Sequence, residues 1–68
     1  MIFENIRNLR EDNDKIQQEI ADYLNMKQTT YSKYERGKFN IPIEVFIKLA
    51  DYYDVSLDYL TGRSKNKK

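Results

Sequence analysis

The stretch MKQTTYSKYERGKFNIP, residues 26–42, decides the fold of this chain. Tyr31 and Tyr34 are three residues apart, as on one face of a helix, and the polar side chains around them share the opposite face. Gly37 then favours a helix end, and Pro42 favours the first turn of a new helix. We therefore predict a helix over residues 28–36, a loop over residues 38–41 and a second helix over residues 42–53.

The rest of the chain is predicted to be helical as well. Apolar residues recur three and four apart, and the 68 residues include only two glycines and one proline. Helices are expected over residues 3–13 and 16–24, and a short one after Ser56, its N-cap, ends at Gly62. The start of the 16–24 helix stays ambiguous, because Asp14 is an alternative cap with Gln17 at capping-box spacing. The prediction is an all-α, compact five-helix domain over residues 1–62, followed by a basic, flexible tail over residues 63–68.

One apolar face of each helix is predicted to build the core. The side chains expected to face inward are Ile2, Ile6, Leu9, Ile16, Ile20, Ala21, Leu24, Met26, Tyr31, Tyr34, Ile43, Phe46, Leu49, Ala50 and Tyr53.

Composition excludes several classes of function. The chain has no histidine and no cysteine, so it lacks the commonest general base, disulfides and most metal-ligand sets. It also has no glycine-rich phosphate loop and no paired inward carboxylates, so an enzyme is not expected and neither a metal nor a cofactor is assigned. No apolar run approaches the length of a membrane span, which predicts a cytoplasmic protein with no membrane partner.

Positive charge is concentrated in two places although the whole chain carries a net charge of only +1. Residues 27–40 carry a net charge of +3 and residues 63–68 a net charge of +4, whereas residues 1–26 and 41–62 each carry −3. A local basic patch suits a polyanion such as a nucleic acid, although mixed charge also simply keeps a small domain soluble.

Residues 17–36 have the pattern of a helix-turn-helix, with Asn25 at the turn and small Ala21 where two helices approach closely. QQEIADYLNMKQTTYSKYERGKFNIP (17–42) and VFIKLADYYDVSLDYLTG (45–62) together resemble the lambda-repressor-like helix-turn-helix family, of the Xre or Cro/cI type. The resemblance covers about residues 6–62. It implies a prokaryotic or phage regulator that reads duplex DNA in the major groove with the 28–36 helix.

The resemblance also implies residue roles. Base edges are expected to be contacted by Gln28, Thr29, Ser32 and Lys33. Phosphates are expected to be contacted by Gln17, Lys27, Tyr31, Arg36, Lys38 and Asn40. Arg10 and Glu35 match a structural ion pair. Tyr31 stands where the family more often has a small aliphatic residue, and a phosphate at the rim is expected to partner its hydroxyl.

The predicted function is sequence-specific binding of double-stranded DNA by a transcriptional regulator, acting as a repressor. A homodimer on a pseudo-palindromic operator is expected, with the 57–62 helix and a flank carrying Val45 and Tyr52 as its surface. The sequence leaves open control by a second regulatory protein. The alternative is an antitoxin-type module that neutralises a partner protein and also binds DNA; a large apolar patch outside the 28–36 helix would favour it.

Overall fold

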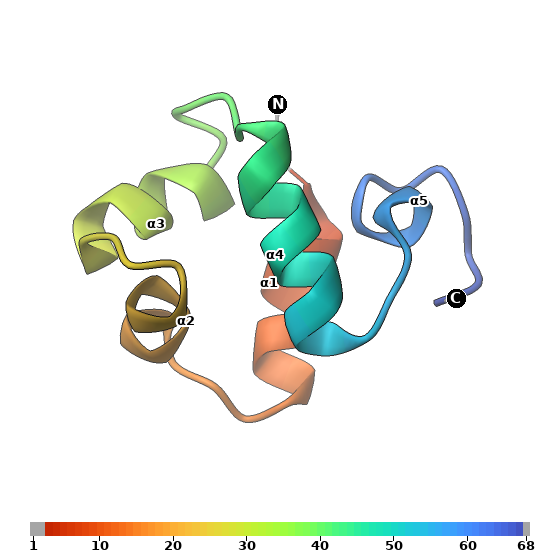
Figure 1. Cartoon of the computed structure of the whole chain (residues 1–68), viewed down its shortest axis with the longest axis horizontal. Helices are drawn as coiled ribbons and strands as arrows, with labels where there is room; N and C mark the ends of the chain where they lie inside the picture. The colour runs from red at the N-terminus through yellow and green to blue at the C-terminus, as the bar shows by residue number, and fades with distance from the viewer. Residues whose placement is uncertain (1–2, 68) are drawn as a thin grey trace.

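The structure, a computed structural model, describes residues 3–67 and is all-helical over that range. In chain order the helices are α1 (Glu4–Asp12), α2 (Gln17–Tyr23), α3 (Gln28–Glu35), α4 (Ile43–Tyr53) and α5 (Leu57–Leu60). α2 and α3 lie on one side of α4 and α5 lies on the other (Figure 1), and α1 packs against α3 and α5. The predicted all-α fold with five helices is confirmed, and the predicted bounds agree within about two residues.

Each of the five helices is followed by a residue with positive φ, and this conformation turns the chain sharply out of the helix. These residues, with φ between 55° and 82°, are Asp14, Asn25, Gly37, Asp54 and Gly62. At the end of α2 the Met26 N–H donates to the Ala21 carbonyl oxygen at 3.0 Å, and the Asn25 N–H donates to the Asp22 carbonyl oxygen at 3.1 Å. This pair of bonds is a Schellman motif, and asparagine fits it because it tolerates the left-handed region better than most L residues.

The N-cap of α2 is Ile16 and not Asp14. Asp14 has φ 56° and belongs to the turn that ends α1, so the alternative in which it caps α2 is wrong. Ile16 is the N-cap in extended conformation, and its N–H donates to the Glu19 carboxylate at 3.2 Å. Because Ile16 is the N-cap and has a non-helical backbone conformation, its side chain does not point to the same side as the buried face of α2. It is 61% exposed, and its predicted place in the core is wrong.

The core lies where α1 to α5 meet. Its buried side chains are Ile6, Leu9, Ile20, Ala21, Leu24, Tyr31, Phe46, Leu49, Ala50 and Leu60. Met26, Tyr34 and Tyr53 pack against them, as predicted, while Ile2 lies outside the described residues.

One flank of α4 differs from the prediction. Ile43 is 60% exposed and Ile47 is exposed one turn later, because both lie beside the buried stripe of the helix rather than on it. Val45 and Tyr52, expected on the exposed flank, are half-buried against the core. The apolar side chains that α4 presents to solvent are therefore Ile43 and Ile47, which corrects the predicted flank.

The basic C-terminal segment folds back toward α5. The Ser56 N–H donates to the Lys67 carbonyl oxygen at 2.7 Å, and the N–H groups of Arg63 and Ser64 both donate to the Asp58 carbonyl oxygen. Ser56 also caps α5 as predicted, since its Oγ accepts the Tyr59 N–H at 3.0 Å.

Residues 3–67 contain neither a membrane-spanning helix nor a cluster of metal-binding side chains. No helix in this range has the length and apolar character needed to cross a bilayer. The same range holds no group of three or more His, Cys, Asp or Glu side chains placed to bind a metal ion.

Candidate nucleic-acid interface

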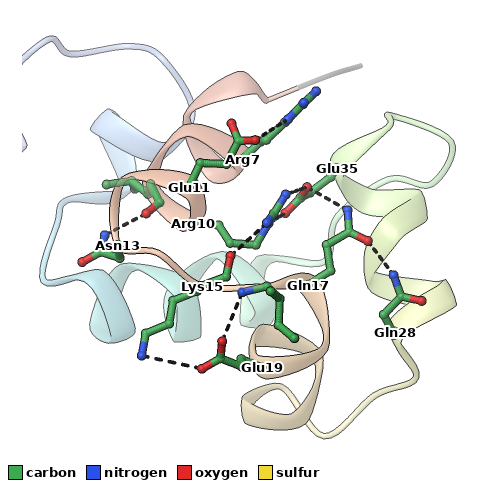
Figure 2. Close-up of polar contacts among 11 residues, drawn as sticks. Arg7, Arg10, Glu11, Asn13, Lys15, Gln17, Glu19, Gln28 and Glu35 are labelled. Carbon is green, nitrogen blue, oxygen red and sulfur yellow. Dashed lines mark hydrogen bonds and ion pairs between the residues drawn. The ribbon is translucent and has the colours of Figure 1, made fainter.

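A buried ion pair joins α1 to the last turn of α3. Arg10 Nε donates to Glu35 Oε2 at 2.7 Å and Arg10 Nη2 donates to Glu35 Oε1 at 3.0 Å, while Arg10 Nη1 donates to the Lys15 carbonyl oxygen at 3.0 Å (Figure 2). The side chains are only 12% and 3% exposed, respectively. The planar guanidinium thus donates hydrogen bonds to both carboxylate oxygens and to one backbone carbonyl. A lysine ammonium group could not make this planar, two-pronged contact with the carboxylate.

The environment of this pair favours its charged form. Burial on its own raises the pKa of Glu35, but the hydrogen bonds from Arg10 and Gln17, together with the nearby Tyr31 hydroxyl, outweigh it, and the pKa lies below its ordinary value. The hydrogen bond to Glu35 raises the pKa of Arg10, against an opposing effect of burial. Glu35 is therefore ionised wherever the protein is folded near neutral pH.

Two glutamines extend the ion pair to the start of α3. Gln17 Nε2 donates to Glu35 Oε1 at 3.0 Å, and Gln28 Nε2 donates to Gln17 Oε1 at 2.6 Å (Figure 2). Since a carboxylate only accepts, Gln17 must point its amide nitrogen at Glu35, which leaves its oxygen for Gln28. Gln28 keeps its own oxygen and one N–H unused by these bonds, and Gln17 keeps one N–H.

The remaining candidate residues form a polar surface on α3 and the loop after it. Thr29, Arg36, Lys38 and Asn40 are exposed, as is Lys27 at the N-cap of α3, and Ser32 and Lys33 are half-buried. An open hollow between the helices is lined by Arg7, Arg10, Gln17, Ser32, Glu35 and Arg36. Apart from Tyr31 and the buried Arg10–Glu35 pair, the candidate residues are thus exposed or half-buried on α2, on α3 and on the residues that flank α3.

Tyr31 does not belong to this surface. Its side chain is 0% exposed, and its hydroxyl is buried without a hydrogen bond of ordinary geometry. Burial first, and the neighbouring Glu35 carboxylate second, raise the pKa of Tyr31 well above its usual value. The expected contact between Tyr31 and a phosphate is therefore wrong, because a ring needed to join α3 to the core cannot reach a ligand outside.

Comparison with known proteins agrees with this geometry. A sequence profile described as helix-turn-helix matches residues 6–60, which is most of the chain.

The chain belongs to the helix-turn-helix family, within its Xre/cI-like branch.

Relatives in this family are regulators rather than enzymes. The chain is 37% identical over 62 residues, 91% of its length, to the cryptic phage CTXphi transcriptional repressor RstR of Vibrio cholerae. It is 34% identical over 67 residues, 98% of its length, to the HTH-type transcriptional regulator AnsR of Bacillus subtilis. A crystal structure of a transcriptional regulator from Listeria innocua superposes with a TM-score of 0.85 at 30% identity and covers 97% of this chain.

These helix-turn-helix relatives are longer than the chain described here. The chain spans 55% of the Vibrio repressor, 58% of AnsR and 62% of the Listeria protein. The shared part is the helix-turn-helix domain itself, and none of these three relatives is described as an antitoxin.

Within the helix-turn-helix, the start of α3 is open to an anion. No side chain caps α3, and no acidic residue stands in its first turn. The first N–H groups of a helix have no partner inside it, and they carry the positive end of the helix dipole. Together with exposed Lys27 they form a suitable position for a phosphate.

Two further residues lie in this region although their sequence pattern did not mark them as candidates. Arg7 lines the hollow together with Arg36, but its spacing to Glu11, with which it pairs at 3.5 Å, indicates only a surface pair on α1. Phe39 lies against Lys33, with the Lys33 Nζ 4.9 Å from the centre of the ring. The one available signal was an aromatic residue between the polar residues Lys38 and Asn40.

Proposed function

We propose that this chain binds double-stranded DNA sequence-specifically as a transcriptional regulator, acting as a repressor. In this proposal α3 enters the major groove and α2 lies across the backbone. The observation that carries it is the polar outward face of α3, whose first side chain, Gln28, is held by Gln17, in a chain of the helix-turn-helix family. The relatives' descriptions as a phage repressor and transcriptional regulators support the same role.

Base reading is assigned to Gln28, Thr29, Ser32 and Lys33. The oxygen and N–H that Gln28 keeps free are the two groups needed for a bidentate contact to adenine. Thr29 offers a methyl group to thymine, Lys33 offers a donor to guanine O6 and N7, and Ser32 suits either kind of base.

Backbone contacts are assigned to Gln17, Lys27, Arg36, Lys38 and Asn40. Gln17 uses its remaining N–H, so the same side chain touches a phosphate and fixes Gln28. The cations neutralise phosphates and displace counterions, which makes the affinity fall as salt rises. Gln17 is therefore expected to couple a phosphate contact of its own to the base contact of Gln28, which it holds by a hydrogen bond.

The regulator is proposed to act in the cytoplasm as a homodimer on a pseudo-palindromic operator. A single domain of this size makes few base contacts, so two copies with half-sites about 34–36 Å apart provide the required specificity. Control by a second regulatory protein is compatible with this arrangement.

The proposal is tested by selecting binding sites from a random duplex pool with purified protein at near-physiological salt. A symmetric motif with two half-sites about one helical turn apart is expected. Absence of enrichment, or binding that disappears as salt approaches physiological values, would contradict sequence reading and favour a protein partner, which a pull-down would then seek.

A further inference from the structure

The ring of Phe39 lies beneath the ammonium group of Lys33. The Lys33 Nζ is 4.9 Å from the ring centre, inside the roughly 6 Å range in which a cation is attracted to an aromatic face. Phe39 is 45% exposed and belongs to the loop after α3, whereas Lys33 lies in the last turn of α3. The contact therefore joins the last turn of α3 to the loop that follows it.

The loop is built to hold this ring in place. The Lys38 N–H donates to the Lys33 carbonyl oxygen at 2.9 Å and the Gly37 N–H donates to the Tyr34 carbonyl oxygen at 3.2 Å, with Gly37 at φ 74°. These bonds form a Schellman motif, which folds the loop back along α3. The backbone of Lys33 thus anchors the turn that carries Phe39.

A second aromatic ring connects Phe39 to the core. The rings of Tyr34 and Phe39 have centres 6.3 Å apart and planes at 67°, an edge-to-face arrangement of the favourable kind. Tyr34 itself packs against the buried core. Phe39 is therefore a platform tied to the fold, and not a freely moving loop side chain.

A fixed platform matters because lysine is flexible. A lysine side chain loses much of its rotamer freedom when it is ordered, and a group already ordered in the free protein avoids part of that cost on binding. We propose that Phe39 is a positioning residue that holds the Lys33 ammonium on the outward face of α3 for its contact with a base pair. This role rests on the proposed function, since it requires Lys33 to meet DNA.

Direct contact between Phe39 and DNA is the competing explanation. An apolar ring can touch a thymine methyl group without involving Lys33. The two explanations differ in one respect: positioning requires that the effect of Phe39 depend on the Lys33 charge, whereas direct contact does not.

A double-mutant cycle separates them. Wild type, F39L, K33M and the double variant are titrated with the selected duplex and with a duplex changed at the base pair that Lys33 discriminates. We expect F39L to lower discrimination at that pair about two- to fivefold, in line with an exposed cation–π contact, and to have no further effect in the K33M background. F39W is the matched control and should retain wild-type discrimination, because tryptophan is the better platform.

A measurement without DNA checks the pairing itself. The Lys33 Hε protons should show an upfield ring-current shift by NMR in the wild type and lose it in F39L, with thermal unfolding confirming that F39L is folded. Absence of the shift, or an equal loss of affinity from F39L with and without the Lys33 charge, would overturn the positioning role while leaving sequence-specific binding intact. If the wild type enriches no motif although the shift is present, the proposed function fails, and with it the role in base reading.

Discussion

The two ends of α3 are held in different ways. At its start, Gln28 is joined through Gln17 to the Glu35–Arg10 pair, so a chain of hydrogen bonds leads from an accessible side chain to a buried charge. At its end, Lys33 rests on Phe39, a contact between half-buried and exposed groups on a glycine-stabilised turn. The support of Gln28 is a buried charge pair that also joins α1 to α3, whereas the support of Lys33 is a half-exposed ring that packs on Tyr34. Changes at the first end should therefore alter stability and binding together.

The largest expected effect comes from Glu35→Gln. It keeps the shape of the side chain but leaves the Arg10 guanidinium buried opposite a neutral amide. Breaking a buried pair from one side costs about 3–5 kcal/mol, as much as the whole net stability expected for a domain of this size. We expect Glu35→Gln to be largely unfolded at 25 °C, as measured by circular dichroism with urea denaturation.

The matched control is Glu11→Gln. Glu11 also pairs with an arginine, Arg7, but at 3.5 Å and with half of its side chain exposed. Its loss should change the free energy of unfolding by no more than about 1 kcal/mol. Equal effects of the two substitutions would mean that the Arg10–Glu35 pair is not the support described here.

Lowering the pH is a milder way to weaken the same Arg10–Glu35 pair. Because the pKa of Glu35 is lower in the folded chain than in the unfolded chain, its contribution to stability is present above the unfolded value, about 4.3, and is lost as pH falls through the folded value. The free energy of unfolding should therefore decline below about pH 4–5. The decline should be shallower in Glu35→Gln measured with a stabilising osmolyte, and identical slopes would contradict the assignment.

A smaller effect is expected at the second end from Gly37→Ala. Gly37 has φ 74°, a conformation that costs an L residue about 1–2 kcal/mol. Urea denaturation should show a loss of that size. Asn25→Gly is the control at the equivalent turn after α2; with φ 58° already tolerated by asparagine, it should change stability by less. A loss from Asn25→Gly as large as that from Gly37→Ala would show that the left-handed conformation is not what Gly37 supplies.

The sequence predicts the fold well because helix periodicity and turn residues are local signals. Five helices and most of the core follow from apolar spacing, but Ile16 was misplaced because it is an N-cap, where the chain direction rather than the helical repeat decides where a side chain points. Ile43 was misplaced because it lies beside the buried stripe of α4 rather than on it. Val45 and Tyr52 were misplaced because neighbouring elements of the fold cover part of their side chains, and helical spacing does not show which flank of a helix is covered.

The candidate site is predicted less completely. The pattern placed the polar face of α3, yet the Gln17–Gln28 bond joins residues on different helices and depends on their packing. Tyr31 was expected to pack inward and still to reach a phosphate through its hydroxyl, but the hydroxyl is buried as well. Phe39 gave no periodic signal at all. Contacts of this kind follow from tertiary geometry, which spacing along the chain does not contain.

In the proposed complex, α3 reads bases while the following loop contacts the DNA backbone. The measurement to make first is the binding of Lys33→Ala and Lys38→Ala to a randomised duplex library. We expect Lys33→Ala to lose about 1–3 kcal/mol of discrimination at one base pair, and Lys38→Ala to weaken binding to all sequences alike and to reduce the salt dependence by about one charge. A uniform loss of affinity in both variants would show that α3 does not lie in the groove as proposed.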